Sequence, residues 1–256
     1  MPELKRPGGE LASRPLHFFW IVDCSGSMYG DKIGAVNHAI QSAIPDMADS
    51  ARDNPNAQLM VRTLKFSSGA NWVNSQPVDI EDFTWNDLDA GGITDMGKAF
   101  NLLAAQLTIP PMSDRALPPV LVLLSDGQPT DDYKTGLDNL MKLPWAKKAV
   151  RIAIAIGQDA DDEVLLEFTG NRELVLQANN ATMLTKMIKW ASTAASMVSA
   201  PASRAIPNES AGSIDGTGNA SNDNIPNIPP SGGTGPLVLD MNNIPSPDDI
   251  NDTDVW

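Results

Sequence analysis

Residues 17–28 read His-Phe-Phe-Trp-Ile-Val-Asp-Cys-Ser-Gly-Ser-Met, and this stretch decides the fold. Residues 17–22 form a run of aromatic and β-branched side chains, which is typical of a strand buried on both faces. An acid and two hydroxyl residues follow this strand directly. A buried strand that ends in polar residues favours an α/β protein with a parallel sheet, whose ligand site lies at the carboxyl ends of the strands.

Further strands are expected along the chain. Two more apolar runs, at residues 119–124 and 150–156, predict inner strands, and residues 57–66 predict another. Residues 70–78 alternate with polar side chains, which is typical of a strand at the edge of a sheet. A last short strand is predicted at residues 173–176.

Helical periodicity separates these strands. Apolar residues recur at helical spacing between Lys32 and Met47, and Pro45 is expected to kink or end that helix. Further helices are predicted at residues 96–107, 133–143, 162–168 and 183–198. This alternation predicts a doubly wound, mostly parallel, Rossmann-like sheet with one antiparallel edge strand.

The charge and composition exclude several classes of protein. The chain has 256 residues, with 18 Lys and Arg against 32 Asp and Glu, and a net charge of −14. This balance disfavours nucleic-acid binding, since phosphates are bound by Lys and Arg. One Cys and two His leave no disulfide framework and no Cys-rich zinc site. Neither a membrane span nor a signal peptide is visible, so a cytoplasmic protein without membrane contact is expected.

Three regions differ in composition. We expect an N-terminal extension at residues 1–14, a folded domain at 15–199 and a tail at 200–256. The tail has eight acids, one base and eight prolines, which predicts disorder because it can bury little apolar surface. Its apolar residues, such as those in Gly-Pro-Leu-Val-Leu-Asp at 235–240, could also form short segments that dock on a partner or on the folded domain of the chain itself.

Oxygen-bearing side chains follow three expected strands or loops at one edge of the sheet. They are Asp23, Ser25, Ser27, Thr94 and Asp126. Two carboxylates and three hydroxyls suit a hard cation such as Mg²⁺, with Mn²⁺ or Ca²⁺ as alternatives. Because few of these ligands are charged, a bound ion would stay able to accept an anionic oxygen from outside.

The sequence Asp-Cys-Ser-Gly-Ser-Met at 23–28, with Thr94 and Asp126, resembles the metal-ion-dependent adhesion site of von Willebrand factor type A domains. The runs at 91–99 and 125–131 look most like bacterial TerY/YegL-type proteins, which are linked to tellurium-resistance gene sets. The resemblance implies that Ser25, Ser27 and Thr94 offer hydroxyls to Mg²⁺ and that both aspartates lie at the ion, directly or through water.

This resemblance implies a non-catalytic interaction module whose metal binds an Asp or Glu of a protein partner. The implied partners are a kinase and a PP2C-type phosphatase in stress or defence signalling, or alternatively a MoxR-type AAA+ ATPase. A metal-dependent phosphohydrolase is a further alternative. Against it, Ser25 stands where haloacid-dehalogenase-like phosphatases have a second Asp, and no Walker-type phosphate loop is present.

Several residues near these candidate metal ligands are expected to have structural roles only. Asp95 is expected to cap the following helix, while Asp131 and Asp132 are expected to start the helix after them. Cys24 is interpreted as a small buried residue whose side chain points away from the ion. His17 is expected to serve packing or to lie at the surface.

Overall fold

The computed structural model describes residues 13–54 and 56–199. Its centre is one sheet with the strand order β3-β2-β1-β5-β6-β7, and β4 pairs with β2 beside β3. The inner pairings, β2 with β1, β1 with β5, β5 with β6 and β6 with β7, are all parallel. The pairings of β3 and β4 with β2 are antiparallel. The predicted doubly wound, mostly parallel sheet is therefore confirmed.

The strands have the following bounds: β1 Arg14–Asp23, β2 Ala57–Ser67, β3 Gly69–Trp72, β4 Val78–Asp79, β5 Val120–Ser125, β6 Val150–Ile156 and β7 Val175–Ala178. The predicted edge strand at 70–78 is thus two short strands. Asn74 and Ser75 lie between these two strands. Their carbonyl oxygens accept hydrogen bonds from the Arg62 guanidinium at 3.0 and 2.6 Å. This side-chain pairing takes the place of a continuous ladder.

The predicted strand at 173–176 begins two residues too early. Residues 172–174 form a 3₁₀ turn instead, and the strand β7 starts only at Val175. The side chain of Asn171 stabilises this turn by accepting a hydrogen bond from the Glu173 amide at 3.1 Å.

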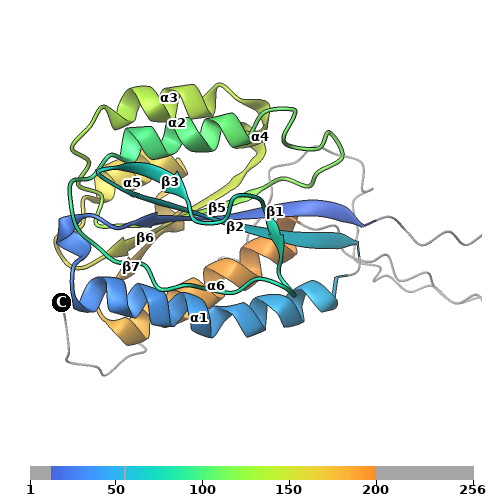
Figure 1. The fold of residues 1–256 in the computed structure, drawn as a ribbon, viewed down its shortest axis with the longest axis horizontal. Helices are drawn as coiled ribbons and strands as arrows, with labels where there is room; N and C mark the ends of the chain where they lie inside the picture. Colours follow the sequence, from blue (N-terminus) through green and yellow to red (C-terminus); the bar gives the residue numbers. More distant parts are fainter. Residues whose placement is uncertain (1–12, 55, 200–256) are drawn as a thin grey trace, which may run out of the picture.

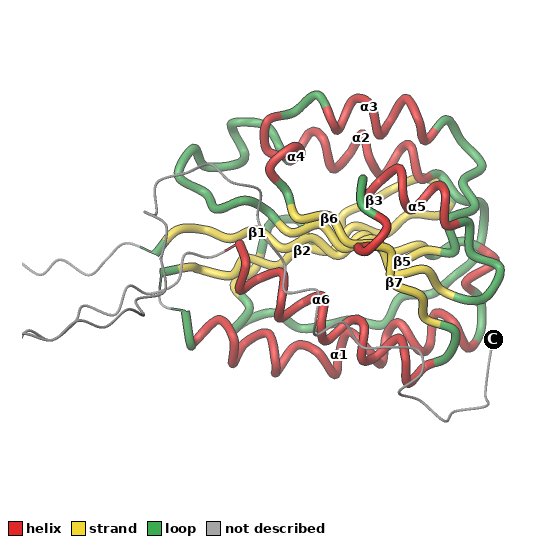
Figure 2. Tube along the Cα trace, turned by 180° about the vertical axis from the view of Figure 1, so that it is seen from behind, coloured by secondary structure: helices red, strands yellow, loops and turns green. Residues whose placement is uncertain are grey.

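Two layers of helices cover the sheet. Figure 1 shows α1 and α6 on one face and α2, α3 and α5 on the other, and Figure 2 shows the same layers from behind. The helices are α1 Asp31–Arg52, α2 Met96–Gln106, α3 Tyr133–Met141, α4 Pro144–Lys148, α5 Asp162–Thr169 and α6 Ala181–Ser199, and the 3₁₀ turns are η1 Gly26–Met28 and η2 Arg172–Leu174.

Of the two outcomes expected at Pro45, a kink or the end of the first helix, the second is wrong, since α1 continues to Arg52. Pro45 lies on the exposed side of the helix, whereas Ala43 and Met47 are fully buried against the sheet side. A proline on the solvent side is tolerated because carbonyl groups there can tilt toward water. Burial of the opposite face offsets the lost hydrogen bond.

The alternation of side chains along β1 builds both cores. Phe18, Trp20 and Val22 belong to the core beneath α1 and α6. Phe19 and Ile21 belong to the core beneath α2, α3 and α5. All five are fully buried, which confirms the prediction of a strand covered on both faces. This packing fixes Asp23, the last residue of β1, at the carboxyl edge of the sheet.

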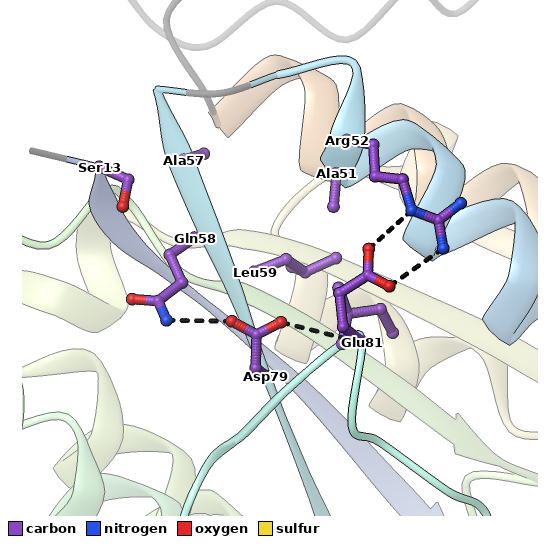
Figure 3. A pocket seen from close by; sticks show the side chains of 9 residues that line it. Ser13, Ala51, Arg52, Ala57, Gln58, Leu59, Asp79 and Glu81 are labelled. Carbon is purple, nitrogen blue, oxygen red and sulfur yellow. Dashed lines mark hydrogen bonds and ion pairs between the residues drawn. The ribbon is translucent and has the colours of Figure 1, made fainter. Parts of the chain in front are cut away.

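A hollow of about 340 Å³ lies at the opposite edge, where β1 and β2 begin. Figure 3 shows that its charged and amide side chains are paired. Arg52 binds both carboxylate oxygens of Glu81 at 2.8 and 3.0 Å, and Gln58 donates to Asp79 at 3.0 Å. Because these groups are already satisfied by one another, the hollow is not the candidate site.

No helix within residues 13–54 and 56–199 is long and apolar enough to cross a membrane. The predicted tail at 200–256 and most of the predicted extension at 1–14 lie outside the described residues.

His17 gives the fold a testable acid sensitivity. Its ring is stacked on Phe19 with centroids 6.0 Å apart. Burial, together with the charge of Arg62, lowers the pKa of His17 from 6.5 to about 4. Between these values the unfolded chain takes up a proton that the folded chain does not, so the contribution of His17 to stability falls as the pH falls.

We therefore expect the wild-type protein to lose about 2 kcal/mol of unfolding free energy relative to His17→Gln when the pH falls from 7.5 to 4.5. Urea denaturation of both proteins at the two pH values measures this difference. Parallel losses in the two proteins would show that the proton uptake of His17 does not differ between the folded and unfolded states.

Candidate metal centre

The candidate site is built at the carboxyl edge of β1 and β5, which are parallel neighbours. The Asp23 carboxylate accepts hydrogen bonds from the Ser25 amide at 2.8 Å and from the Ser125 hydroxyl at 2.6 Å. Ser125 in turn accepts from the Gly127 amide at 2.9 Å. The end of β5 therefore holds the carboxylate at the end of β1 in a fixed orientation.

The two serine hydroxyls lie beside each other. The Oγ atoms of Ser25 and Ser27 are 3.0 Å apart, and the short turn η1 lies between the strand and α1. Ser25 is buried, whereas Ser27 is exposed. A group of oxygens that is closed on the protein side and open on the solvent side leaves room for a ligand from outside.

Thr94 enters from a separate loop. The Gly26 amide donates to the Gly92 carbonyl at 3.0 Å, and the Gly91 amide donates to the Cys24 carbonyl at 2.8 Å. Thr94 itself is buried, and its amide donates to the Thr130 hydroxyl at 3.0 Å. Backbone contacts thus join the loop of Thr94 to the loop of the serines.

Asp126 carries the observation that points to a cation. It is fully buried, and neither carboxylate oxygen has a hydrogen-bond partner among the described residues. A buried carboxylate without a partner is costly unless a cation compensates it. Burial raises the pKa of Asp23 to about 6, and the charge of Asp126 acts in the same direction. A divalent ion between these groups would remove both costs, so the residues present fit a metal.

The donor set is rich in hydroxyls rather than acids. No group of three or more His, Cys, Asp or Glu suited to a metal occurs within residues 13–54 and 56–199. With two carboxylates and three hydroxyls, the site suits a hard ion that keeps an exchangeable position.

The neighbouring acids differ in part from expectation. Asp95 stands at the N-cap position of α2 without capping it, and its carboxylate accepts from the Gly69 amide and from Lys98, both at 2.7 Å. Asp131 caps α2 from another loop, because its oxygens accept from the Gly97 and Lys98 amides at 2.8 and 3.0 Å. Asp132 starts α3 as predicted, since its carboxylate accepts from the Thr135 amide.

Cys24 is buried, as predicted. Burial, reinforced by the charge of Asp23, raises the pKa of the Cys24 thiol to about 12. A thiol in this state is a poor nucleophile and a poor metal ligand.

Asn37 is a positioning residue that the sequence did not reveal. It is buried in α1, donates to the Leu88 carbonyl at 3.0 Å and accepts from the Leu88 amide at 2.9 Å and from the Trp85 indole at 3.1 Å. These bonds fix the long segment that leads into the loop of Thr94. These partners are some 50 residues away along the sequence, so no local sequence pattern predicts the contacts.

We expect Asn37→Asp to weaken Mg²⁺ binding about tenfold, because a carboxylate would face the Leu88 carbonyl and the donor would be lost. Hydrogen exchange should rise at residues 85–94 before it rises in the sheet. Gln41→Ala is the matched control, since exposed Gln41 on the same helix binds Asp87 of the same segment at 3.2 Å. Equal effects of the two substitutions would contradict the role given to Asn37.

The fold and the site together define a Rossmann-like domain with a hydroxyl-rich candidate cation site at the carboxyl edge of its sheet. The sequence profile of the von Willebrand factor type A domain matches residues 19–190. The chain therefore belongs to the von Willebrand factor type A domain family.

Solved structures of low sequence identity share this fold. Proximal thread matrix protein 1 from the mussel byssus is 16% identical, with a TM-score of 0.53 over 73% of this chain and 49% of its own. A von Willebrand factor type A protein from Catenulispora acidiphila is 18% identical, with a TM-score of 0.52 over 72% of this chain and 43% of its own. The chain thus spans about half of these proteins or less.

A further structure of the mussel protein is described as having a zinc-occupied MIDAS motif, where MIDAS stands for metal-ion-dependent adhesion site. It is 17% identical, with a TM-score of 0.50 over 72% of this chain and 46% of its own. No curated protein sequence matches the chain.

Proposed function

We propose that the protein is a non-catalytic interaction module that binds an acidic side chain of a protein partner through a divalent cation. The observation that carries this proposal is the buried Asp126 carboxylate, both of whose oxygens lack a partner among the described residues. Asp23, Ser25, Ser27, Thr94 and Asp126 would hold the ion, directly or through water. Mg²⁺ is the proposed ion, and Mn²⁺ or Ca²⁺ are alternatives.

The bound ion would supply an electrophilic position for a carboxylate from outside. The chain's own residues orient this position: Ser125 fixes Asp23, and the Gly26–Gly92 contact joins the two loops that carry the hydroxyls. The exposed side of the site, at Ser27, is where a partner would approach. A charge-assisted contact of this kind is strong enough to dominate a modest interface. The zinc-occupied site in the similar mussel protein supports metal binding here.

For the partner, we propose a kinase and a PP2C-type phosphatase of a bacterial stress or defence system, on the basis of the likeness to TerY/YegL-type proteins. The runs at 91–99 and 125–131 motivate this proposal. A MoxR-type AAA+ ATPase is the other partner to test.

The experiment is capture of the purified candidate partner by the full chain in Mg²⁺, in EDTA, and in Mg²⁺ with Asp126→Ala. We expect capture only in the first condition. Equal capture in all three would overturn the metal-mediated contact. Capture of the ATPase but not of the kinase or phosphatase would leave the metal contact intact and correct the partner.

A further inference from the structure

The two loops that carry the candidate metal-binding hydroxyls also carry two exposed apolar side chains. Tyr29 is 78% exposed and Ile93 is 51% exposed. They come from the two loops that the Gly26–Gly92 hydrogen bond joins, and each lies within three residues of that bond. Within the described part of the chain, large hydrophobic side chains with this exposure are few, the others being Val73 and Ile109.

An exposed aromatic side chain and an exposed aliphatic side chain beside a cation site define a surface with a particular chemistry. The cation position would attract a carboxylate. Contact of the two side chains with apolar groups would be favourable because it removes apolar surface from water. The ligand that fits is a short segment in which apolar residues adjoin an acid.

The chain itself contains such a segment. Residues 237–240 read Leu-Val-Leu-Asp, and these three leucine and valine residues form the longest apolar run after residue 199. The tail from 200 to 256 is acidic, with eight acids against one base, so its charge complements a cation site.

The reach of the chain also permits this contact. β7 is parallel to the rest of the inner sheet and ends at Ala178, at the same carboxyl edge of the sheet as the candidate metal site. α6 runs back from there to Ser199, and a helix of 19 residues is about 28 Å long. The random-coil relation gives roughly 40 residues a root-mean-square span of about 35 Å, which exceeds the length of α6. A tethered ligand of this length has an effective concentration near the millimolar range.

We propose that residues 235–240 bind the metal face of their own domain, with the Asp240 carboxylate on the ion and Leu237 to Leu239 over Tyr29 and Ile93. The tail would then compete with any partner for the same position. This inference rests on the proposed function, because it needs a cation with an open position.

The test is hydrogen exchange of the full chain, measured by mass spectrometry in Mg²⁺ and in EDTA. We expect amides at 26–30, 91–94 and 237–240 to exchange at least tenfold more slowly in Mg²⁺. Asp240→Asn and Ile93→Ser should lose this protection at 237–240. Asp215→Asn, which removes a tail acid with no apolar run beside it, should keep it.

Calorimetric titration with Mg²⁺ separates the two ways of failing. Mg²⁺ binding without protection at 237–240, or protection that Asp240→Asn leaves unchanged, would overturn the tail contact and leave the proposed function standing. No Mg²⁺ binding at all would overturn both. Protection that grows with protein concentration, together with a dimer in sedimentation, would overturn the contact within one chain in favour of the tail of a second copy.

Discussion

Asp126→Asn is expected to make the metal-free protein more stable and to abolish its stabilisation by Mg²⁺. The wild-type carboxylate is fully buried, and neither of its oxygens has a partner among the described residues. The amide has the same shape without the charge, and it removes the repulsion from Asp23. We expect a gain of about 2 kcal/mol in the unfolding free energy in EDTA.

Mg²⁺ should stabilise the wild type but not Asp126→Asn, and so it should offset the advantage that the substituted protein has in EDTA. A ligand at a hundred times its dissociation constant stabilises the folded state by about 2.7 kcal/mol. The wild type should show this shift in thermal or urea unfolding, whereas Asp126→Asn should show none. Asp114→Asn, at an exposed loop position, should change either quantity by less than about 0.5 kcal/mol. A substituted protein that is less stable in EDTA, or that still responds to Mg²⁺, would contradict the account of Asp126.

Gly136→Ala is expected to cost about 3 kcal/mol of unfolding free energy. α2 and α3 approach each other at two glycines, and a Cβ at Gly136 would lie 2.5 Å from the Gly97 carbonyl oxygen and 2.8 Å from its Cα. Backbone atoms cannot move aside as a flexible side chain can, so the helices would have to separate. Since α2 follows directly after Thr94, Mg²⁺ affinity should fall as well.

The matched control is Gly34→Ala, at a helical glycine of α1 whose added Cβ would meet nothing within 4 Å. There alanine should stabilise the protein by about 0.5–1 kcal/mol, because it favours the helix and meets no obstacle. Urea unfolding of both proteins measures the contrast. Two changes of the same sign would show that the contact between α2 and α3 is not as tight as described.

Much of the fold could be predicted from local patterns. The apolar run at 17–22 predicted a strand buried on both faces because such side chains are stable only between two covered layers, and the prediction of residues 150–156 matched β6 at both ends. Errors arose where a distant side chain overrides the local pattern. Arg62 donates hydrogen bonds to the carbonyls of Asn74 and Ser75, which therefore do not pair in the expected edge strand. Burial of one face of α1 stabilises this helix beyond Pro45.

The candidate site also has residues that local sequence patterns predict and residues that they do not. Asp23, Ser25, Ser27 and Asp126 could be named because they follow predicted strands at one edge of a parallel sheet, and Thr94 because it lies in the loop before a predicted helix. The groups that hold the loops in place could not, since Asn37 binds Leu88 and Asp131 caps α2 across long stretches of sequence. The metal ligation by Asp23, Ser25, Ser27, Thr94 and Asp126 stays a prediction.

The central claim is that these five residues hold one divalent cation. The most direct measurement is an anomalous difference map from crystals of the full chain grown with Mn²⁺. We predict one strong peak bounded by the Ser25 and Ser27 hydroxyls, Thr94 and the two aspartates, and no such peak for Asp126→Asn. A wild-type map without a peak there, or with the ion bound only at other acids such as Asp79 and Glu81, would contradict the account.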